Sequence, residues 1–288
     1  MEQMKKDRPD IQAVDITTDS GSHHLIAELA FELGYNVLCE KPLSLTIRGC
    51  NRVIEAWKKS GKVLSVGEQE RRDPICRLNK AIIDEGIIGN PYSFIQGSAR
   101  GGNDIIIWPW RHYKNIGGIF VDAGVHTVDQ MMYYLGDIEE VFAVSKIWEP
   151  KRYKGEKIGV ANFYDHWVNE VPDEIDATAE DMVISTMKYK NGAVGQWTSF
   201  FAAHGEVTEY GMIYGSKGSI SPAKQRRGDP LTITLDGAGT ISGNDVLELV
   251  PNFHLDELPA RLFGSDRLGS YNTCLLYTSP SPRDRQKS

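Results

Sequence analysis

Apolar residues in the first ninety positions fall into short β-branched runs separated by stretches with helical spacing. The runs at 11–17 (IQAVDIT), 36–39 and 63–67 predict buried strands. The stretches between them predict three helices. The first begins at Ser20 or Ser22 and ends at Gly34, the second covers 46–60 and ends at Gly61, and the third covers 74–84. Strands that alternate with helices in this way predict a parallel sheet with right-handed crossovers.

The pattern changes after Tyr92, where strand-like segments dominate. They cover 92–97, 140–148, 181–189, 193–200, 208–214 and 231–235, and one clear helix covers 125–135. The turn Lys190-Asn191-Gly192 predicts a hairpin between two of these strands. We therefore expect an α/β chain: a partial Rossmann-type parallel sheet over 1–90, then an α+β domain over 91–274 with a large, open, mostly antiparallel sheet. Because large open sheets often bury their free face in an assembly, we also expect a homo-oligomer, either a dimer or a tetramer.

Two segments do not follow these patterns. Residues 151–174 form a long polar excursion that carries Phe163, Tyr164 and Trp167, which is typical of a lid or a partner contact. Residues 275–288 (LLYTSPSPRDRQKS) have no periodicity, and we interpret them as a non-native tail outside the fold.

Composition narrows the classes of function. The chain has 288 residues, 41% hydrophobic and 25% charged, with a net charge of -7 that argues against nucleic-acid binding. Four scattered cysteines predict reduced thiols rather than a disulfide framework or a metal site. The sequence has no apolar run of membrane-spanning length and no secretion signal at its start, so we expect a cytoplasmic protein without a membrane partner.

Three residues indicate a chemistry. Lys41 follows a buried strand in Cys39-Glu40-Lys41-Pro42, and Asp122 and His126 follow a Gly-Gly turn, four residues apart. On one helix, that spacing would place the carboxylate and the imidazole on the same face of the first turn. A lysine, a carboxylate and a histidine can relay a proton from a hydroxyl group while a hydride leaves the same carbon. The set therefore predicts a dehydrogenase acting on an alcohol or a sugar.

Four motifs in order resemble the Gfo/Idh/MocA family of nicotinamide-dependent oxidoreductases. The first runs from His23 through Ala27, Ala30, Gly34 and Val37 to Glu40-Lys41-Pro42. The second runs from Val66-Gly67 through Arg71 to Pro74, and the third is Gly86-Ile87-Ile88-Gly89. The fourth runs from Trp110-Arg111 through Gly117-Gly118, Asp122, His126 and Asp129 to Leu135-Gly136. The resemblance covers about residues 10 to 220.

The resemblance implies roles for individual residues. Lys41, Asp122 and His126 would be catalytic, with His126 as acid/base and Asp122 as its electrostatic partner or a substrate ligand. Trp110 and Arg111 would form a sugar-binding wall together with Asp122 and His126. NAD or NADP would contact a set of residues around the strand ends: Thr17, Thr18, His23, Glu40, Lys41, Pro42 and Gln69. No metal is implied.

Each role has a plainer explanation beside it. Lys41 could be a surface lysine, Asp122 a helix cap, and His126 a half-buried histidine. Asp129 could orient His126 or simply be a solvent-facing residue of its helix. The residues at 17 and 18 could be ordinary strand-end threonines, and the residue at 69 could be a plain loop glutamine. The tryptophans at 108 and 110 could be core residues under the second sheet.

The sequence also departs from the family pattern. The G-x-G-x-x-G loop and the residue that selects NAD or NADP are absent, and we interpret the chain as lacking two N-terminal strand-helix units. Asp19 and Glu68 stand where the family has proline and an apolar or aromatic residue.

The resulting hypothesis is hydride transfer between a nicotinamide cofactor and a sugar, inositol or related polyol. Two different functions stay open beside it: an NAD-dependent glycoside hydrolase of the same fold, and a non-catalytic binding or assembly subunit.

Overall fold

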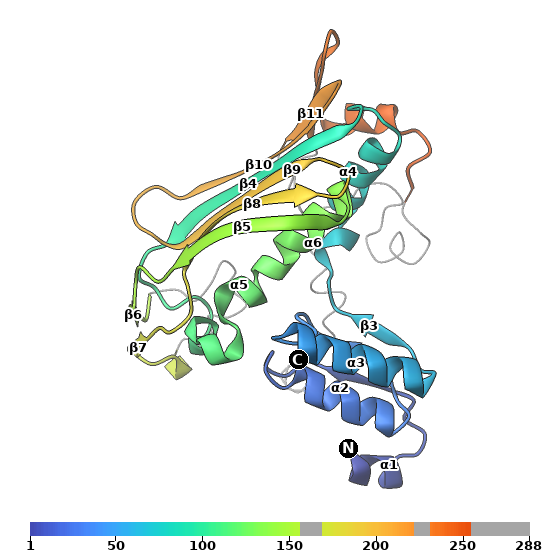
Figure 1. Ribbon diagram of the computed structural model, residues 1–288, viewed down its shortest axis with the longest axis vertical. Coiled ribbons are helices and arrows are strands. Elements are labelled where there is room, and N and C mark those ends of the chain that lie inside the picture. Colours follow the sequence, from blue (N-terminus) through green and yellow to red (C-terminus); the bar gives the residue numbers. More distant parts are fainter. Residues whose placement is uncertain (156–168, 222–230, 255–288) are drawn as a thin grey trace. The chain divides into compact units, whose positions relative to one another are not determined.

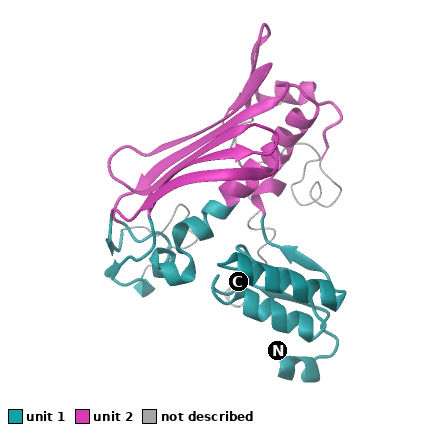
Figure 2. Cartoon of the chain, in the orientation of Figure 1, with its two compact units in different colours: residues 1–68, 104–125, 149–180 teal, residues 69–103, 126–148, 181–288 magenta. Residues whose placement is uncertain are grey.

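The structure is a computed structural model that describes residues 1–155, 169–221 and 231–254. The chain divides into two compact, discontinuous units (Figure 2). Unit 1 comprises residues 1–68, 104–125 and 149–180, and unit 2 comprises residues 69–103, 126–148 and 181 onward. Within the described residues, no helix is long and apolar enough to cross a bilayer.

Unit 1 contains the predicted parallel sheet. Strands β1 (Ala13–Ile16), β2 (Asn36–Cys39) and β3 (Leu64–Val66) pair in parallel in the order β1-β2-β3. The crossover helices are α2 (His23–Glu32) and α3 (Ile47–Ser60), which pack side by side (Figure 1). A short helix, α1 (Glu2–Asp7), precedes β1. The alternation of strand and helix predicted from the sequence is confirmed.

Local chemistry sets the ends of these helices. Thr46 caps α3 by accepting a hydrogen bond from the backbone N–H of Gly49, and Gly61 ends it in the left-handed conformation at φ 65°. Ser22 lies at the N-cap of α2, but its hydroxyl donates to Thr18 Oγ1 at 2.7 Å instead of capping the helix.

The other described elements of unit 1 are short, and one of them carries a buried arginine. These are η2 (Pro109–His112), η3 (Lys114–Ile116), α5 (Gly118–Asp122), β6 (Lys151–Tyr153) and β7 (Glu174–Asp176). Arg152 of β6 is fully buried and donates to the backbone carbonyls of Glu149 and Asp104. Ile105, Val171 and Ile175 form a small core, against which Trp108 packs.

Unit 2 is built on an eight-stranded sheet with the order β13-β12-β11-β10-β4-β9-β8-β5. Its strands are β4 (Pro91–Gly101), β5 (Ile138–Lys146), β8 (Met182–Tyr189), β9 (Val194–Ala203), β10 (Thr208–Gly215), β11 (Gly218–Ser221), β12 (Thr232–Leu235) and β13 (Gly239–Ser242). All neighbours are antiparallel except β4 and β9. The predicted hairpin turn joins β8 to β9, with Gly192 at φ 86°.

Helices α4 (Pro74–Asp84) and α6 (Gly124–Leu135) lie along one face of this sheet (Figure 1), with the short η1 (Glu70–Arg72) before α4 and η5 (Gly243–Leu249) after β13. The core between helices and sheet includes Leu78, Ile82, Phe94, Met131 and Tyr189. The other face of the sheet is open. Alternate residues of β8 show this, because Val183, Ser185 and Met187 are buried while Ile184 is exposed.

The long excursion at 151–174 contains β6 at its start, and β7 begins at its last residue. Phe163, Tyr164 and Trp167, together with the tail at 275–288, lie outside the described residues.

Candidate active site

The carboxyl ends of the three parallel strands meet at one edge of the small sheet. Ile16, Cys39 and Val66 are in register there, so the residues that follow them emerge together. The backbone N–H of Glu40 donates to the Ile16 carbonyl at 2.9 Å, and that of Gly67 donates to the Cys39 carbonyl at 2.7 Å. This edge is where open α/β sheets place their ligands.

A buried carboxylate lies between two cations in unit 1. Lys41 Nζ is 2.8 Å from Asp122 Oδ1 and also donates to the Asp122 backbone carbonyl at 2.8 Å. Arg111 Nη2 lies 2.9 Å from the other carboxylate oxygen, Oδ2. The side chains of Lys41, Asp122 and Arg111 are only 13%, 5% and 16% exposed, so little water screens these charges. The structure thus brings together three of the predicted site residues from positions 41, 111 and 122.

Trp110 contacts this cluster through Arg111, the next residue in the chain. The Arg111 guanidinium carbon is 5.2 Å from the centroid of the Trp110 ring, within the range of a cation–π contact. The indole is half-buried on η2. Trp108 packs against the small core of unit 1.

The predicted cofactor residues of unit 1 gather at the strand edge. Thr17 and Thr18 are exposed after β1, and Glu40 Oε2 accepts from the Lys41 backbone N–H at 3.2 Å. The Lys41–Pro42 peptide bond is cis. His23 is buried at the start of α2, and its ring bridges two backbone carbonyls. Nδ1 lies 2.8 Å from the Pro42 oxygen and Nε2 lies 3.1 Å from the Thr18 oxygen.

Gln69 and His126 belong to unit 2, and both are buried. The segment that follows Gln69 is joined to α6 by two neighbouring side-chain pairs. Arg71 binds the Asp129 carboxylate with Nε at 2.6 Å and with Nη2, and Gln130 donates to Glu70 Oε2 at 2.9 Å. His126 lies one turn before Asp129 on α6.

One expectation about this region is wrong. Asp122 and His126 do not share the first turn of one helix: Asp122 is the last residue of α5, and His126 lies in the first turn of α6. The chain breaks helical hydrogen bonding at Ala123, which caps α5.

Sequence reasoning assigned no role to Arg71, Glu70 or Gln130, and it did not find the partner of Asp129. The sequence did contain a signal for these contacts. In the mostly apolar helix, Asp129 and Gln130 follow His126 by three and four residues and therefore lie on the same face. Polar residues on such a face need partners when buried.

Burial also sets the state of the thiol next to the site. It raises the pKa of Cys39 to about 12, with Glu40 and Asp15 adding repulsion of the thiolate. Cys39 is therefore a neutral core residue rather than a nucleophile. Across the described part of the chain, no three His, Cys, Asp or Glu side chains form a metal-binding group.

Comparison with known proteins shows the class of this chain. Residues 1–68 match the profile described as "Oxidoreductase family, NAD-binding Rossmann fold", and residues 77–221 match the GFO/IDH/MocA C-terminal domain. The chain is thus built as an oxidoreductase with a nucleotide-binding domain and a second, sheet-based domain. It belongs to the Gfo/Idh/MocA family.

Similar proteins of this family act on sugars and inositols, according to their names. The levoglucosan dehydrogenase of Pseudarthrobacter phenanthrenivorans is 32% identical over 230 residues, which are 77% of this chain and 57% of that protein. The myo-inositol 2-dehydrogenase of Thermotoga maritima is 27% identical over 74% of this chain and 56% of its own length.

A levoglucosan dehydrogenase solved with NADH and L-sorbose has a TM-score of 0.67 and 30% identity, and the match covers 82% of this chain and 62% of that one. The chain thus spans little more than half the length of these curated relatives.

Proposed function

We propose that this protein works as an NAD-dependent oxidoreductase on a hydroxyl group of a sugar, inositol or related polyol. The observation that carries the proposal is the buried Lys41–Asp122–Arg111 cluster next to the carboxyl edge of the parallel strands. Similarity to levoglucosan and inositol dehydrogenases supports the substrate class.

Lys41 is suited to hold a substrate hydroxyl. An ammonium group has three N–H donors, and two of them are engaged by the Asp122 carboxylate and carbonyl oxygens. Asp122 thereby fixes the direction of the third donor, which we assign to the reacting oxygen. As the alcohol is oxidised, its C–H hydride leaves and its O–H bond breaks. Lys41 stabilises the negative charge that develops on that oxygen.

His126 is the proposed acceptor of the hydroxyl proton. An imidazole can take up and return a proton near neutral pH. Only three residues separate it from Asp122, so the chain itself limits their Cα atoms to about 14 Å apart. In the reverse direction, His126 returns the proton as the carbonyl is reduced.

Arg111 and Trp110 are proposed to bind the sugar. Nε of Arg111 is buried and has no hydrogen-bond acceptor among the described residues, while Nη2 pairs with Asp122. That unused donor suits a second hydroxyl of the substrate. The Trp110 ring offers an apolar wall for the C–H face of a sugar ring.

The strand edge fits a nicotinamide nucleotide. Thr17, Thr18 and Glu40 provide polar groups there. Gly67 has no side chain and so leaves the space next to Glu40 open, where a Cβ at 67 would lie 3.4 Å from Glu40. We extend the assignment to Pro42 and Gln69, whereas the buried His23 ring contacts two backbone carbonyls and supports this edge from inside the unit. When bound, the nicotinamide accepts or supplies the hydride.

The test is turnover by the product of the full open reading frame. It is incubated with NAD or NADP and a panel of sugars and polyols, and NADH formation is followed. Lys41→Met and His126→Ala should each lower kcat at least about a hundredfold. Lys114→Met, which removes an exposed lysine paired with Glu180, is the matched control. Full turnover in either site variant would refute the proposal.

Two further outcomes would select a different function. Release of free sugar from a glycoside without net NADH would identify a glycoside hydrolase. Failure to bind any nicotinamide nucleotide in calorimetry would leave the binding or assembly subunit.

We also propose that the open face of the large sheet pairs with a second copy of the chain. This face carries Phe142, Val144, Ile184, Val194 and Tyr210, each 42% to 73% exposed. The five central strands β10, β4, β9, β8 and β5 have 8 to 11 residues each, and their sheet face covers about 750 Å². A stable interface buries on the order of 800 Å² per partner.

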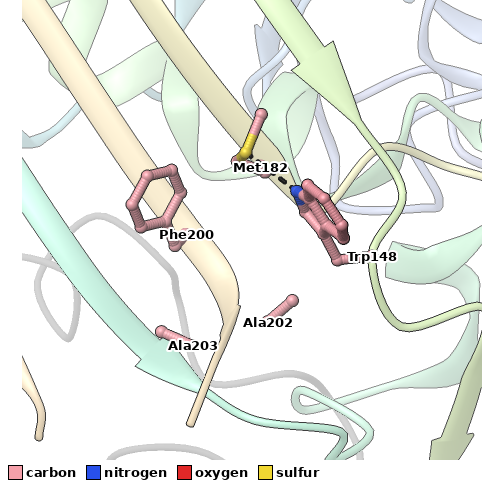
Figure 3. A pocket seen from close by; sticks show the side chains of 5 residues that line it. All are labelled: Trp148, Met182, Phe200, Ala202 and Ala203. Atoms are coloured by element: carbon pink, nitrogen blue, oxygen red, sulfur yellow. Dashed lines mark hydrogen bonds between the residues drawn. The ribbon is translucent and has the colours of Figure 1, made fainter.

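The same face has an apolar pocket lined by Trp148, Met182, Phe200, Ala202 and Ala203 (Figure 3). Trp148 Nε1 lies 3.0 Å from Met182 Sδ across it. A two-fold axis on this face would let Phe142 of one copy fill the pocket of the other.

We also propose that the protein works in the cytoplasm. The described cysteines Cys39, Cys50 and Cys76 are free thiols, and a reducing compartment keeps thiols in that state.

A further inference from the structure

The ring of His23 lies between two backbone carbonyls at the strand edge. One carbonyl, of Thr18, belongs to the loop after β1, and the other, of Pro42, to the turn after β2 that carries Lys41. The ring is 1% exposed, so water does not replace either contact. His23 thus ties together the two loops that follow neighbouring parallel strands.

Both partners can only accept hydrogen bonds. A neutral imidazole has one N–H donor and one lone pair, so it can satisfy only one of two carbonyls. The other contact would then place a ring lone pair against a carbonyl oxygen at 2.8 or 3.1 Å, which is repulsive. Only the doubly protonated ring donates to both.

We propose that His23 is an imidazolium clamp that positions Lys41 by holding the Pro42 and Thr18 carbonyls at once. This is a positioning role, separate from contact with substrate. The role adds to the proposed function. The turnover experiment below rests on that function, whereas the spectroscopic experiment does not.

Two effects oppose the charge and two favour it. Burial and the positive end of α2, which begins at His23, disfavour an imidazolium. Two charge-assisted hydrogen bonds, one to each carbonyl, favour it.

The titratable groups around this ring are Asp15 of β1, Asp19 after it, Cys39, Glu40 and Lys41 around the end of β2, and His24, Glu28 and Glu32 of α2. Helix α3, which packs on α2, adds Arg48, Cys50, Arg52, Glu55, Lys58 and Lys59. Arg52 pairs with Glu28 and Lys41 with Asp122, so these charges are compensated elsewhere. Loss of the His23 proton breaks one contact and frees the turn that carries Lys41.

The first experiment needs neither cofactor nor substrate. The chain is labelled with ¹⁵N in histidine and ¹³C in the backbone carbonyls, and the ring signals of His23 are assigned by their loss in His23→Gln. Both ring nitrogens should carry protons, and each should donate to one of the two carbonyls. His24→Gln, on the same helix, should leave these signals unchanged.

A His23 ring with a proton on only one nitrogen would overturn the clamp. The second experiment measures turnover. His23→Gln should lower kcat at least tenfold while changing the substrate KM less than twofold. A doubly protonated ring in a chain without dehydrogenase activity would refute the proposed function alone. Turnover with a neutral ring would refute the clamp alone.

Discussion

The ammonium group of Lys41 contacts both the side chain and the backbone of Asp122, with Nζ 2.8 Å from Oδ1 and 2.8 Å from the carbonyl oxygen. The two residues are 81 positions apart in the sequence. One residue thus supplies both the counter-charge and a geometric anchor for the lysine. Arg111, which binds the second carboxylate oxygen, leaves the cluster with two cations and one anion.

Asp122→Asn should lower the free energy of unfolding by about 3 kcal/mol, because it leaves two mostly buried cations without a counter-charge. Lys41→Met should cost roughly half as much or less, since the Arg111–Asp122 pair survives. Urea unfolding followed by circular dichroism measures both values. Equal losses in the two variants would contradict the central role of the carboxylate.

Gly118→Ala should be more damaging than Gly136→Ala, although both glycines have positive φ, 68° and 89°. A Cβ at 118 would lie 2.5 Å from the Ala179 Cβ, whereas a Cβ at 136 meets nothing within 4 Å. Backbone strain alone costs about 1 kcal/mol. The steric clash adds to it at 118 and displaces α5, which ends at Asp122. Thermal unfolding of the two variants should therefore separate clash from strain.

Cys39 should make stability fall at alkaline pH. Its pKa is raised by burial to about 12 in the folded chain, against about 8.5 when unfolded. A raised pKa means that the folded state retains the proton. The contribution of the Cys39 thiol to the free energy of unfolding is therefore complete below the pKa of the unfolded chain. It is lost as the pH rises toward the pKa of the folded chain.

Between about pH 9 and pH 11 the free energy of unfolding should decrease by about 1.4 kcal/mol per pH unit from this group. Cys39→Ala should make this slope shallower, whereas Cys50→Ala, at a half-buried position, should change it less. A slope unaffected by Cys39→Ala would contradict the prediction.

Much of the small sheet could be predicted because its signals are local. Thr46 and Gly61 bound α3 by chemistry that acts within one turn, and the β-branched runs mark strands without reference to the rest of the chain. The pairing of Asp122 with Arg111 and of Asp129 with Arg71 was beyond the reach of these signals. A single sequence places charges along the chain but gives no information on which distant charges meet.

The end of α5 was missed for a related reason. The Asp122–His126 spacing fits one helix, and local propensity does not exclude it. Gly117 and Gly118, at φ 96° and 68°, start a separate short helix that ends after five residues, once Asp122 reaches its two cations. Tertiary ion pairing therefore takes precedence over the local pattern here.

Phe142→Glu should convert an oligomer into monomers, because it places a charge at the most exposed apolar side chain of the open face, 73% accessible. Val63→Glu alters an exposed position in unit 1 and should leave the assembly unchanged. Light scattering after size exclusion gives the mass directly. A monomeric wild-type protein at about 10 μM would contradict the proposed pairing, since a stable interface holds well below that concentration.

Arg71 and Asp129 should show measurable energetic coupling, because their bidentate pair joins the segment after Gln69 to the helix that carries His126. Arg71 also lies 5.2 Å from the Tyr133 ring centroid, a second contact that lysine reproduces poorly. The two side chains are 40% and 19% exposed, so solvent weakens the pair, and the coupling should be about 1 kcal/mol. A double-mutant cycle of Arg71→Lys and Asp129→Asn in urea isolates this term from the loss of Tyr133 contact, which appears in Arg71→Lys alone. If the pair also positions His126, kcat should fall in both single variants and no further in the double variant. Additive losses would mean that the two residues act independently.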